Sequence, residues 1–233
     1  MAYSEFSSES YNKRTNSLKA VLATAITNVE NLHVKISAGN RKMGAVPSVS
    51  TLPVLDCGNC SACRKSCYDL RNDCLYNTVK NSRAANSAIL RKDPDRYFAE
   101  IEDWLGKHQP NAFRWHVGGD IKDEHYLSEM CRLATAFPDT KFLAFTKMFG
   151  VVNKFHADGN VIPENLHIMF SGWVGQKMEN PYNHPTTHPI FPDGRTSAHD
   201  GAKLCTGNCT ECLKENRLCW NANNGDEIVF TAH

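Results

Sequence analysis

The sequence lacks a long apolar run, an apolar segment near its N-terminus and a marked excess of charge of either sign. A membrane-spanning helix needs about 20 mostly apolar residues, so we expect no membrane span. The first 17 residues are polar and do not resemble a secretory signal, so we expect a cytoplasmic protein. The formal net charge is +1, whereas obligate nucleic-acid binders carry a basic excess. Nucleic acid therefore stays a possible partner, but the net charge does not indicate it. No long heptad run specifies an oligomer.

Cysteine, in contrast, is abundant, with ten in 233 residues. Disulfides are disfavoured in a reducing compartment, so clustered cysteines indicate metal or redox chemistry. Most of them form two groups, Cys57, Cys60, Cys63 and Cys67, then Cys205, Cys209, Cys212 and Cys219. Outside the groups, Cys131 lies beside the apolar stripe of a predicted helix, so we expect a buried core thiol there. Cys74 is not assigned a role by its position.

The first group has the spacing C-x2-C-x2-C-x3-C. Bacterial ferredoxins use this spacing to direct thiolates at a cubane iron–sulfur cluster, although they continue with proline where this chain has Tyr68. Zinc ribbons instead use two separate C-x2-C pairs. The spacing therefore favours iron–sulfur, most simply [4Fe-4S], over zinc.

The second group combines a C-x3-C-x2-C triplet with Cys219. Radical S-adenosylmethionine enzymes use the same triplet, but theirs follows the first strand of a barrel, whereas this one lies near the C-terminus. Glu211 also stands where an aromatic residue often precedes the last cysteine. Two arrangements remain open: each group holds its own cluster, or both groups share the ligands of one.

Alternating apolar strands and helices predict an α/β fold, either a partial (β/α) barrel or an open, mostly parallel sheet, with cysteine-rich loops near both ends of the chain. We expect five or six strands, which include residues 112–120, 141–147, 166–173 and 227–232. Helices are expected over residues 68–90, after the N-cap Asp93 and Pro94, and between the first two of these strands. A polar, frayed tail is expected over residues 1–17, and a single domain over residues 18–233.

Residues 180–201 are rich in Pro, His and Asp, and their recurrent prolines predict a long surface loop without regular structure. His184, His188 and His199 in this loop are candidate metal ligands, although solvent-exposed loop histidines without a metal are commoner.

The C-terminal ends of parallel strands are where ligands gather in α/β folds. The candidate ligand-binding residues at these ends are His116, Gly118, Gly119, Asp120 and Lys147. Paired glycines let a ligand approach the backbone, Asp120 suits a hydroxyl, amine or metal, and Lys147 suits a carboxylate or phosphate. Alternatively, the Gly-Gly-Asp segment is a tight turn in which Asp120 caps the next helix.

The order of several motifs resembles the phage and prophage gene product 88 domain family. These motifs are GNRKMG, the cysteine run ending in Cys67-Tyr68, RWHVGGDIKDEHYL, FTK and Cys219-Trp220, spread over residues 34–220. The resemblance implies a phage-associated iron–sulfur protein of uncharacterised activity in the host bacterial cytoplasm. It points to Cys57, Cys63, Cys67, Cys205 and Cys219 as cluster ligands, and to Arg114 with His116, Gly119, Asp120 and Lys147 at the strand ends. It also makes one cluster shared by the two ends of the chain credible.

Three functional hypotheses follow. The first is a redox or radical-type enzyme that binds one or two [4Fe-4S] clusters and a small molecule; a likeness of the βα arrangement to radical S-adenosylmethionine barrels raises S-adenosylmethionine as a further cofactor. The second is a non-catalytic module, stabilised by an iron–sulfur cluster or zinc, that binds nucleic acid or a host protein through Arg64, Lys65, Lys80 and Arg83. The third is a two-cluster electron carrier, which would not need the Gly-Gly-Asp site.

Overall fold

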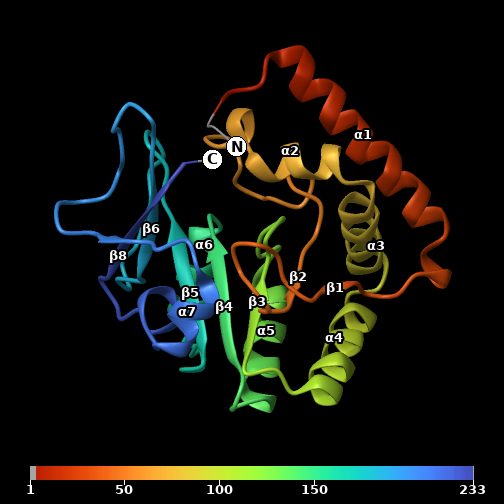
Figure 1. Cartoon of the computed structure of the whole chain (residues 1–233). Coiled ribbons are helices and arrows are strands. Elements are labelled where there is room, and N and C mark those ends of the chain that lie inside the picture. The colour runs from red at the N-terminus through yellow and green to blue at the C-terminus, as the bar shows by residue number, and fades with distance from the viewer. Residues whose placement is uncertain (1–3, 233) are drawn as a thin grey trace.

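The computed structural model describes residues 4–232, apart from the side chain of Cys74, whose role therefore lies outside the described residues. Eight strands of this part of the chain form one sheet in the order β1-β2-β3-β4-β5-β6-β8-β7 (Figure 1). They are β1 (Ile36–Ser37), β2 (Ser48–Val49), β3 (Ala112–Trp115), β4 (Lys141–Thr146), β5 (Leu166–Ser171), β6 (Thr186–Ile190), β7 (Lys203–Leu204) and β8 (Glu227–Thr231).

The sheet is open and mostly parallel, as one of the two predicted architectures requires. Only the β1–β2 pair is antiparallel, and β1 and β7 form the two edges without closing a barrel. The strand expected before the first cysteine group, at Val46, Val49 and Leu52, is present as β2. The expected number of strands was too low because β1 and β7 are each two residues long and β6 lies in a segment expected to be a loop. Strands this short leave no period in the apolar pattern.

The helices lie on both faces of the sheet. They are α1 (Ser8–Thr27), α2 (Tyr68–Leu75), α3 (Asn77–Lys92), α4 (Pro94–His108), α5 (Glu124–Ala136), α6 (Phe149–Ala157) and α7 (Cys209–Lys214), with short 3-10 turns η1 (Val29–Asn31), η2 (Arg64–Ser66) and η3 (Leu218–Trp220). Helices α3 to α6 contribute to the larger apolar core on one face, and α7 with η3 to a smaller core on the other. No helix among the described residues combines the length and apolar character needed to cross a bilayer.

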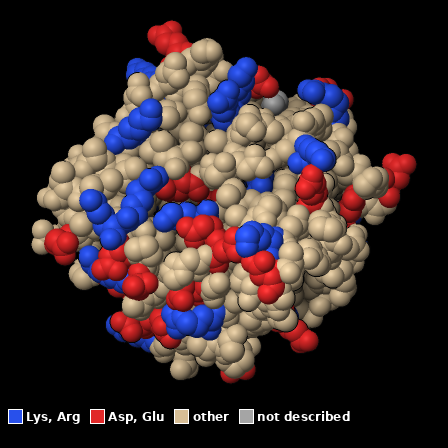
Figure 2. All heavy atoms as spheres, turned by 180° about the vertical axis from the view of Figure 1, so that it is seen from behind, with Lys and Arg blue, Asp and Glu red and all other residues tan. Residues whose placement is uncertain are grey.

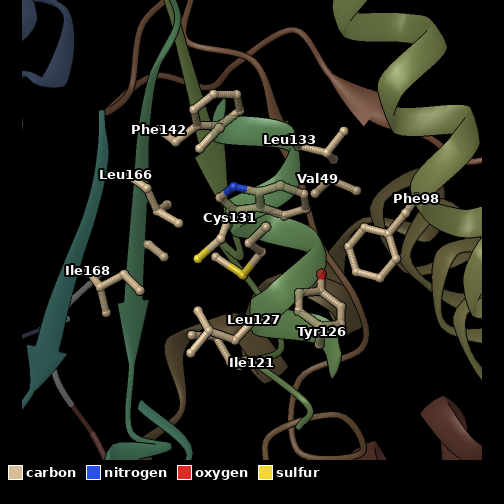
Figure 3. Close-up of a cluster of buried hydrophobic side chains, with 14 of the residues drawn as sticks. Val49, Phe98, Ile121, Tyr126, Leu127, Cys131, Leu133, Phe142, Leu166 and Ile168 are labelled. Carbon is tan, nitrogen blue, oxygen red and sulfur yellow. The ribbon is translucent and has the colours of Figure 1, made fainter. Parts of the chain in front are cut away.

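The larger core fills the space between α5 and the central strands. Figure 3 shows Cys131 of α5 on the side of Leu166 of β5, and Tyr126 of α5 beside Phe98 of α4. Cys131 is 8% exposed, which confirms the expectation of a buried core thiol. Burial raises the pKa of this thiol to about 12, so it stays protonated at neutral pH.

Helix α1 begins ten residues before the predicted start of the domain. The Ser7 hydroxyl accepts a hydrogen bond from the Ser10 backbone N–H, which caps the helix. Leu18 and Leu22 are buried in a third core cluster with Ala84 and Ala88 of α3. The frayed tail expected over residues 1–17 is therefore wrong from Ser8 onward, because α1 packs along α3.

The single helix expected over residues 68–90 is also wrong, because the chain breaks at Tyr76. This residue takes an extended conformation, with φ −121° and ψ 100°. The break allows Asp69 and Asp73 of α2 to reach Arg83 of α3, whose Nη1 lies 2.7 Å from Asp69 Oδ2 and 2.6 Å from Asp73 Oδ1. Arg83 is 7% exposed, so it is not part of a basic surface for phosphate.

Strand β6 lies within the segment predicted to have no regular structure, so that prediction is wrong. Its Pro189 pairs with Phe230 of β8, while the ladder to β5 reaches only Thr187. Successive backbone N–H groups of a central parallel strand point to alternate neighbours. A backbone N–H at position 189 would point toward β5, but the pairing with β5 has already ended at Thr187. The proline, which has no N–H, therefore costs the sheet no hydrogen bond.

Two histidines join α6 to the segment before β6. The Nε2 atoms of His156 and His184 lie 3.0 Å apart, and the His184 ring stacks on Phe170 with centroids 4.8 Å apart. Burial lowers the pKa of His184 from 6.5 to about 4, and the charge of His156 adds to this effect. His184 is therefore neutral in the folded protein at neutral pH.

Acid should destabilise the protein through His184. Its folded pKa lies below its unfolded pKa, so its contribution to stability is full above pH 6.5 and is lost as the pH falls to about 4. We expect the free energy of unfolding to fall by about 2–3 kcal/mol over this range from this group. Denaturant unfolding at both ends of the range, with His184→Gln as control, measures it. An equally steep decrease in the variant would contradict the assignment.

Candidate iron–sulfur centres

The loop that carries the first cysteine group crosses the C-terminal ends of β3 and β4. The backbone N–H of Asp120 donates to the carbonyl of Asp56 at 3.1 Å. The side-chain amide of Asn59 donates to the carbonyl of Lys147, also at 3.1 Å. The loop thus lies at the edge of the sheet where ligands of parallel α/β folds bind.

The four thiols of this loop lie close enough to influence one another. Burial raises the pKa of Cys57 well above its usual value, with added contributions from Asp120, Cys67 and Cys60. Burial also raises the pKa of Cys67 to about 12, with Asp69 and Cys63 adding to it. The backbone N–H of Leu70 donates to Cys67 Sγ at 3.4 Å, so this sulfur also caps α2.

The second cysteine group covers the opposite face of the sheet from α5. Cys209 and Cys212 belong to α7, Cys219 lies in η3, and all three pack with the smaller core. The backbone N–H of Cys209 donates to the carbonyl of Lys42 at 3.1 Å, and that of Cys205 donates to Val229 at 2.7 Å. Burial raises the pKa of Cys219 to about 12; Cys205 and Cys209 add to this, and Arg114 opposes it.

The two groups lie in separate places. In Figure 1 α7, which carries part of the second group, lies well away from α2, which follows directly after the first. Besides burial, the pKa values of Cys209 and Cys219 are shifted by thiols of the second group, by Arg114 and, for Cys209, by Lys42. The thiols that shift the pKa values of Cys57 and Cys67 all belong to the first group. The two cysteine groups are therefore not neighbours in the fold.

The described side chains do not form a ready-made metal site. Within residues 4–232, no group of three or more His, Cys, Asp or Glu side chains is arranged around one metal position. The described cysteines form no disulfide, and backbone N–H groups point at Cys67 and Cys205.

Residues 10–184 match the family model described as gene product 88. The chain belongs to the gene product 88 family. Comparison with curated proteins and with solved structures found no match. The matched region of this gene product 88 chain contains the first cysteine group and the central strands, and it ends before the second group begins at Cys205.

Asp120 of the gene product 88 motif joins two strand ends. One carboxylate oxygen accepts hydrogen bonds from the Thr146 hydroxyl at 2.6 Å and the Ile121 N–H at 2.7 Å. The other oxygen accepts from the Lys147 N–H at 2.9 Å. The alternative in which Asp120 caps the next helix is wrong, because Asp123 caps α5. These protein donors hold the ends of β3 and β4 together beneath the cysteine loop.

The other residues of this motif pack inside the protein. His116 is 3% exposed, and its Nε2 lies 2.8 Å from the Tyr126 hydroxyl. Burial lowers its pKa to about 3, helped by the charge of Arg114, so the ring is neutral. A Cβ at Gly118 would collide with Asp69 and Arg83, and one at Gly119 would collide with Thr51. Gly118 therefore allows α2 to approach the end of β3, and Gly119 allows the segment that follows β2 to do so.

Lys147 is the candidate ligand residue that lines a cavity. Its Nζ donates to the Ser171 hydroxyl at 2.8 Å and lies 5.7 Å from the centre of the Trp173 ring. The cavity has a volume of about 440 Å³, and Gly58 and Asn59 of the cysteine loop form one wall. Residues 147–151, together with Glu124 and Lys154, form the rest. Helix α6, whose first turn contributes to this wall, is a functional element that the sequence pattern does not predict.

The three loop histidines do not converge on one point. His184 contacts His156, as described above, whereas His188 contacts the hydroxyls of Ser197 at 2.8 Å and Thr186 at 3.0 Å. His199 contacts Glu227 at 2.6 Å. The loop therefore offers isolated histidines with separate partners.

Proposed function

We propose that the protein is an iron–sulfur redox enzyme with two [4Fe-4S] centres, one in each cysteine group. The proposal is supported by the division of eight cysteines into two groups of four that lie apart in the fold. The clusters would supply one-electron chemistry when bound. Because each group offers four thiols, neither cluster would keep an iron free for S-adenosylmethionine, so we favour redox over radical chemistry.

The cavity beside the first cysteine loop is the place that we propose for a small-molecule substrate. It is a shallow hollow that is open to solvent, so the substrate would stay partly exposed. Asn59 donates to the Lys147 carbonyl, so the first cysteine loop is attached to the wall of this cavity. The Lys147 ammonium, already oriented by Ser171, suits a carboxylate or phosphate on the substrate.

Iron, zinc and acid-labile sulfide analysis of protein purified without oxygen tests the proposal. Two centres predict about eight irons and eight sulfides per chain, with broad visible absorption. About four of each would mean a single centre. Zinc without sulfide would overturn the proposal and leave a structural module.

The alternative, a module that binds nucleic acid, has less support. Figure 2 shows basic and acidic side chains interspersed over the face that it displays. Of the basic residues expected to contact phosphate, Arg83 is buried between two aspartates and Lys80 donates to Ser17. Arg64 and Lys65, in the first cysteine loop, flank a second cavity of about 270 Å³ with Phe6 and Tyr11. DNA binding that weakens steeply with salt would favour this alternative.

A further inference from the structure

A second cavity lies between the N-terminal part of the chain and the first cysteine loop. Its volume is about 270 Å³, and the residues that line it are Phe6, Ser8, Tyr11, Asn12, Arg64 and Lys65. It shares no lining residue with the cavity proposed for the substrate. Two segments that are far apart in the sequence therefore form a hollow of their own.

Hydrogen bonds hold the two walls of this cavity together. The backbone N–H of Phe6 donates to the carbonyl of Lys65 at 2.7 Å. Arg71 of α2 donates from Nη2 to the carbonyl and to the hydroxyl of Ser4, both at 2.9 Å. In Figure 1 the start of the chain accordingly lies beside α2. The cavity is thus formed by the fold itself, so a ligand would not need to order its walls.

The charged residues that line this cavity are all basic. They are Arg64 and Lys65, and neither forms an ion pair with a carboxylate within residues 4–232. The cavity proposed for the substrate differs, because the Lys154 ammonium there lies 3.1 Å from the carboxylate of Glu124 in the same wall. Cations without carboxylate partners around one hollow favour an anionic ligand.

Two more cations lie behind the same wall. The guanidinium carbons of Arg14 and Arg71 lie 4.9 Å and 5.1 Å from the centre of the Phe6 ring, in cation–π contacts. Glu5 and Glu9 are close in the sequence, but neither lines the cavity. Four cations thus gather around one phenyl ring and one hollow. Their charges repel one another, and a bound anion would relieve this repulsion.

We infer that this cavity binds a phosphate group, carried by inorganic phosphate or by a small phosphate monoester. Its volume lies just below the range of about 300–1,000 Å³ for pockets that hold drug-sized ligands, which suits a small anion. The planar guanidinium of Arg64 matches two phosphate oxygens with parallel N–H groups, and Lys65 adds a point charge. Ser8 and Asn12 add a hydroxyl and an amide as neutral donors.

Isothermal titration calorimetry of the full chain with sodium phosphate, at constant ionic strength, tests the site. We expect saturable binding at one site per chain. Arg64→Gln should weaken it about tenfold or more, because it removes the charge and the paired donors. Arg132→Gln removes an exposed arginine from ion pairs on α5 and should leave the affinity unchanged. Titrations with adenosine monophosphate and with adenosine separate a monoester from inorganic phosphate as the ligand.

Tighter binding of adenosine monophosphate than of inorganic phosphate would identify the monoester, and equal affinities would identify inorganic phosphate. Adenosine binding as tightly as its monophosphate would overturn the inference, since the phosphate would then contribute nothing. So would the absence of saturable binding to the wild type, or an unchanged affinity in Arg64→Gln. Arg64 is exposed, so that variant should unfold at the wild-type temperature; if it does not fold, unchanged affinity in Lys65→Gln overturns the inference instead. Calorimetry reports phosphate binding whether or not the chain holds iron, so this test is independent of the proposed function.

Discussion

Replacing Cys67 with alanine should remove about half of the iron and sulfide, and replacing Cys219 should remove the other half. Each thiol is half-buried and lies near other thiols of its own group, and Cys67 also caps α2. Loss of one ligand in each group would therefore empty one centre and leave the other. The double variant should be colourless. Metal and sulfide analysis after purification without oxygen measures the result.

Cys131→Ala is the matched control for these variants. It removes a buried thiol from α5, within the core that contains neither cysteine group, and should retain all the iron. Complete loss of iron in both single variants would show one cluster shared by the two ends of the chain. Full retention of iron in Cys67→Ala and in Cys219→Ala would rule out both groups as ligands.

Replacing Arg83 with methionine should lower the free energy of unfolding by about 3–5 kcal/mol. Arg83 is the cation that Asp69 and Asp73 share inside the protein, and the variant leaves two buried carboxylates without it. Burial already raises the pKa of Asp73 to about 7 despite the presence of Arg83. Because Asp69 lies in the first turn of α2, which Cys67 caps, the first centre should also lose iron. Urea unfolding and metal analysis measure the two effects.

Arg132→Met controls for the loss of an arginine. Arg132 forms exposed pairs with Glu102 and Glu129, and its replacement should cost less than about 1 kcal/mol. A decrease for Arg83→Met no larger than that for Arg132→Met would contradict the structural role of the buried pairs.

A steric variant tests the same contact from the opposite side. Gly118→Ala places a Cβ against Asp69 and Arg83 and should destabilise the protein by about 1–3 kcal/mol. Gly106→Ala in α4 has no atom within 4 Å of the added Cβ and should stabilise by about 0.5–1 kcal/mol. Equal effects of the two substitutions would show that the approach of α2 to β3 is not tight.

Sequence alone determined those helices, strands and loops whose characteristic residues lie within a few positions of one another. The Asp93 cap is confirmed by its hydrogen bond from the Arg96 N–H at 3.0 Å, and α4 then buries its aromatic stripe. The parallel order of β3 to β5 follows from helices placed between apolar strands. The first four cysteines are placed together because they occupy one short loop. Short-range patterns suffice where the interacting residues are close in the chain.

Tertiary structure alone decided the features that depend on distant residues. The two-residue strands form only because neighbouring strands supply their hydrogen-bond partners. Strand β6 tolerates Pro189 because its pairing with β5 ends at Thr187, before the proline. Asp69 and Asp73 are four residues apart, a spacing that lets two carboxylates on one helix share a cation. The sequence does not say which cation this is, because only the turn at Tyr76 brings Arg83 to them. Composition states which charges and thiols exist. Packing decides which of them share an interior, because a buried charge must find its partner wherever the fold places one.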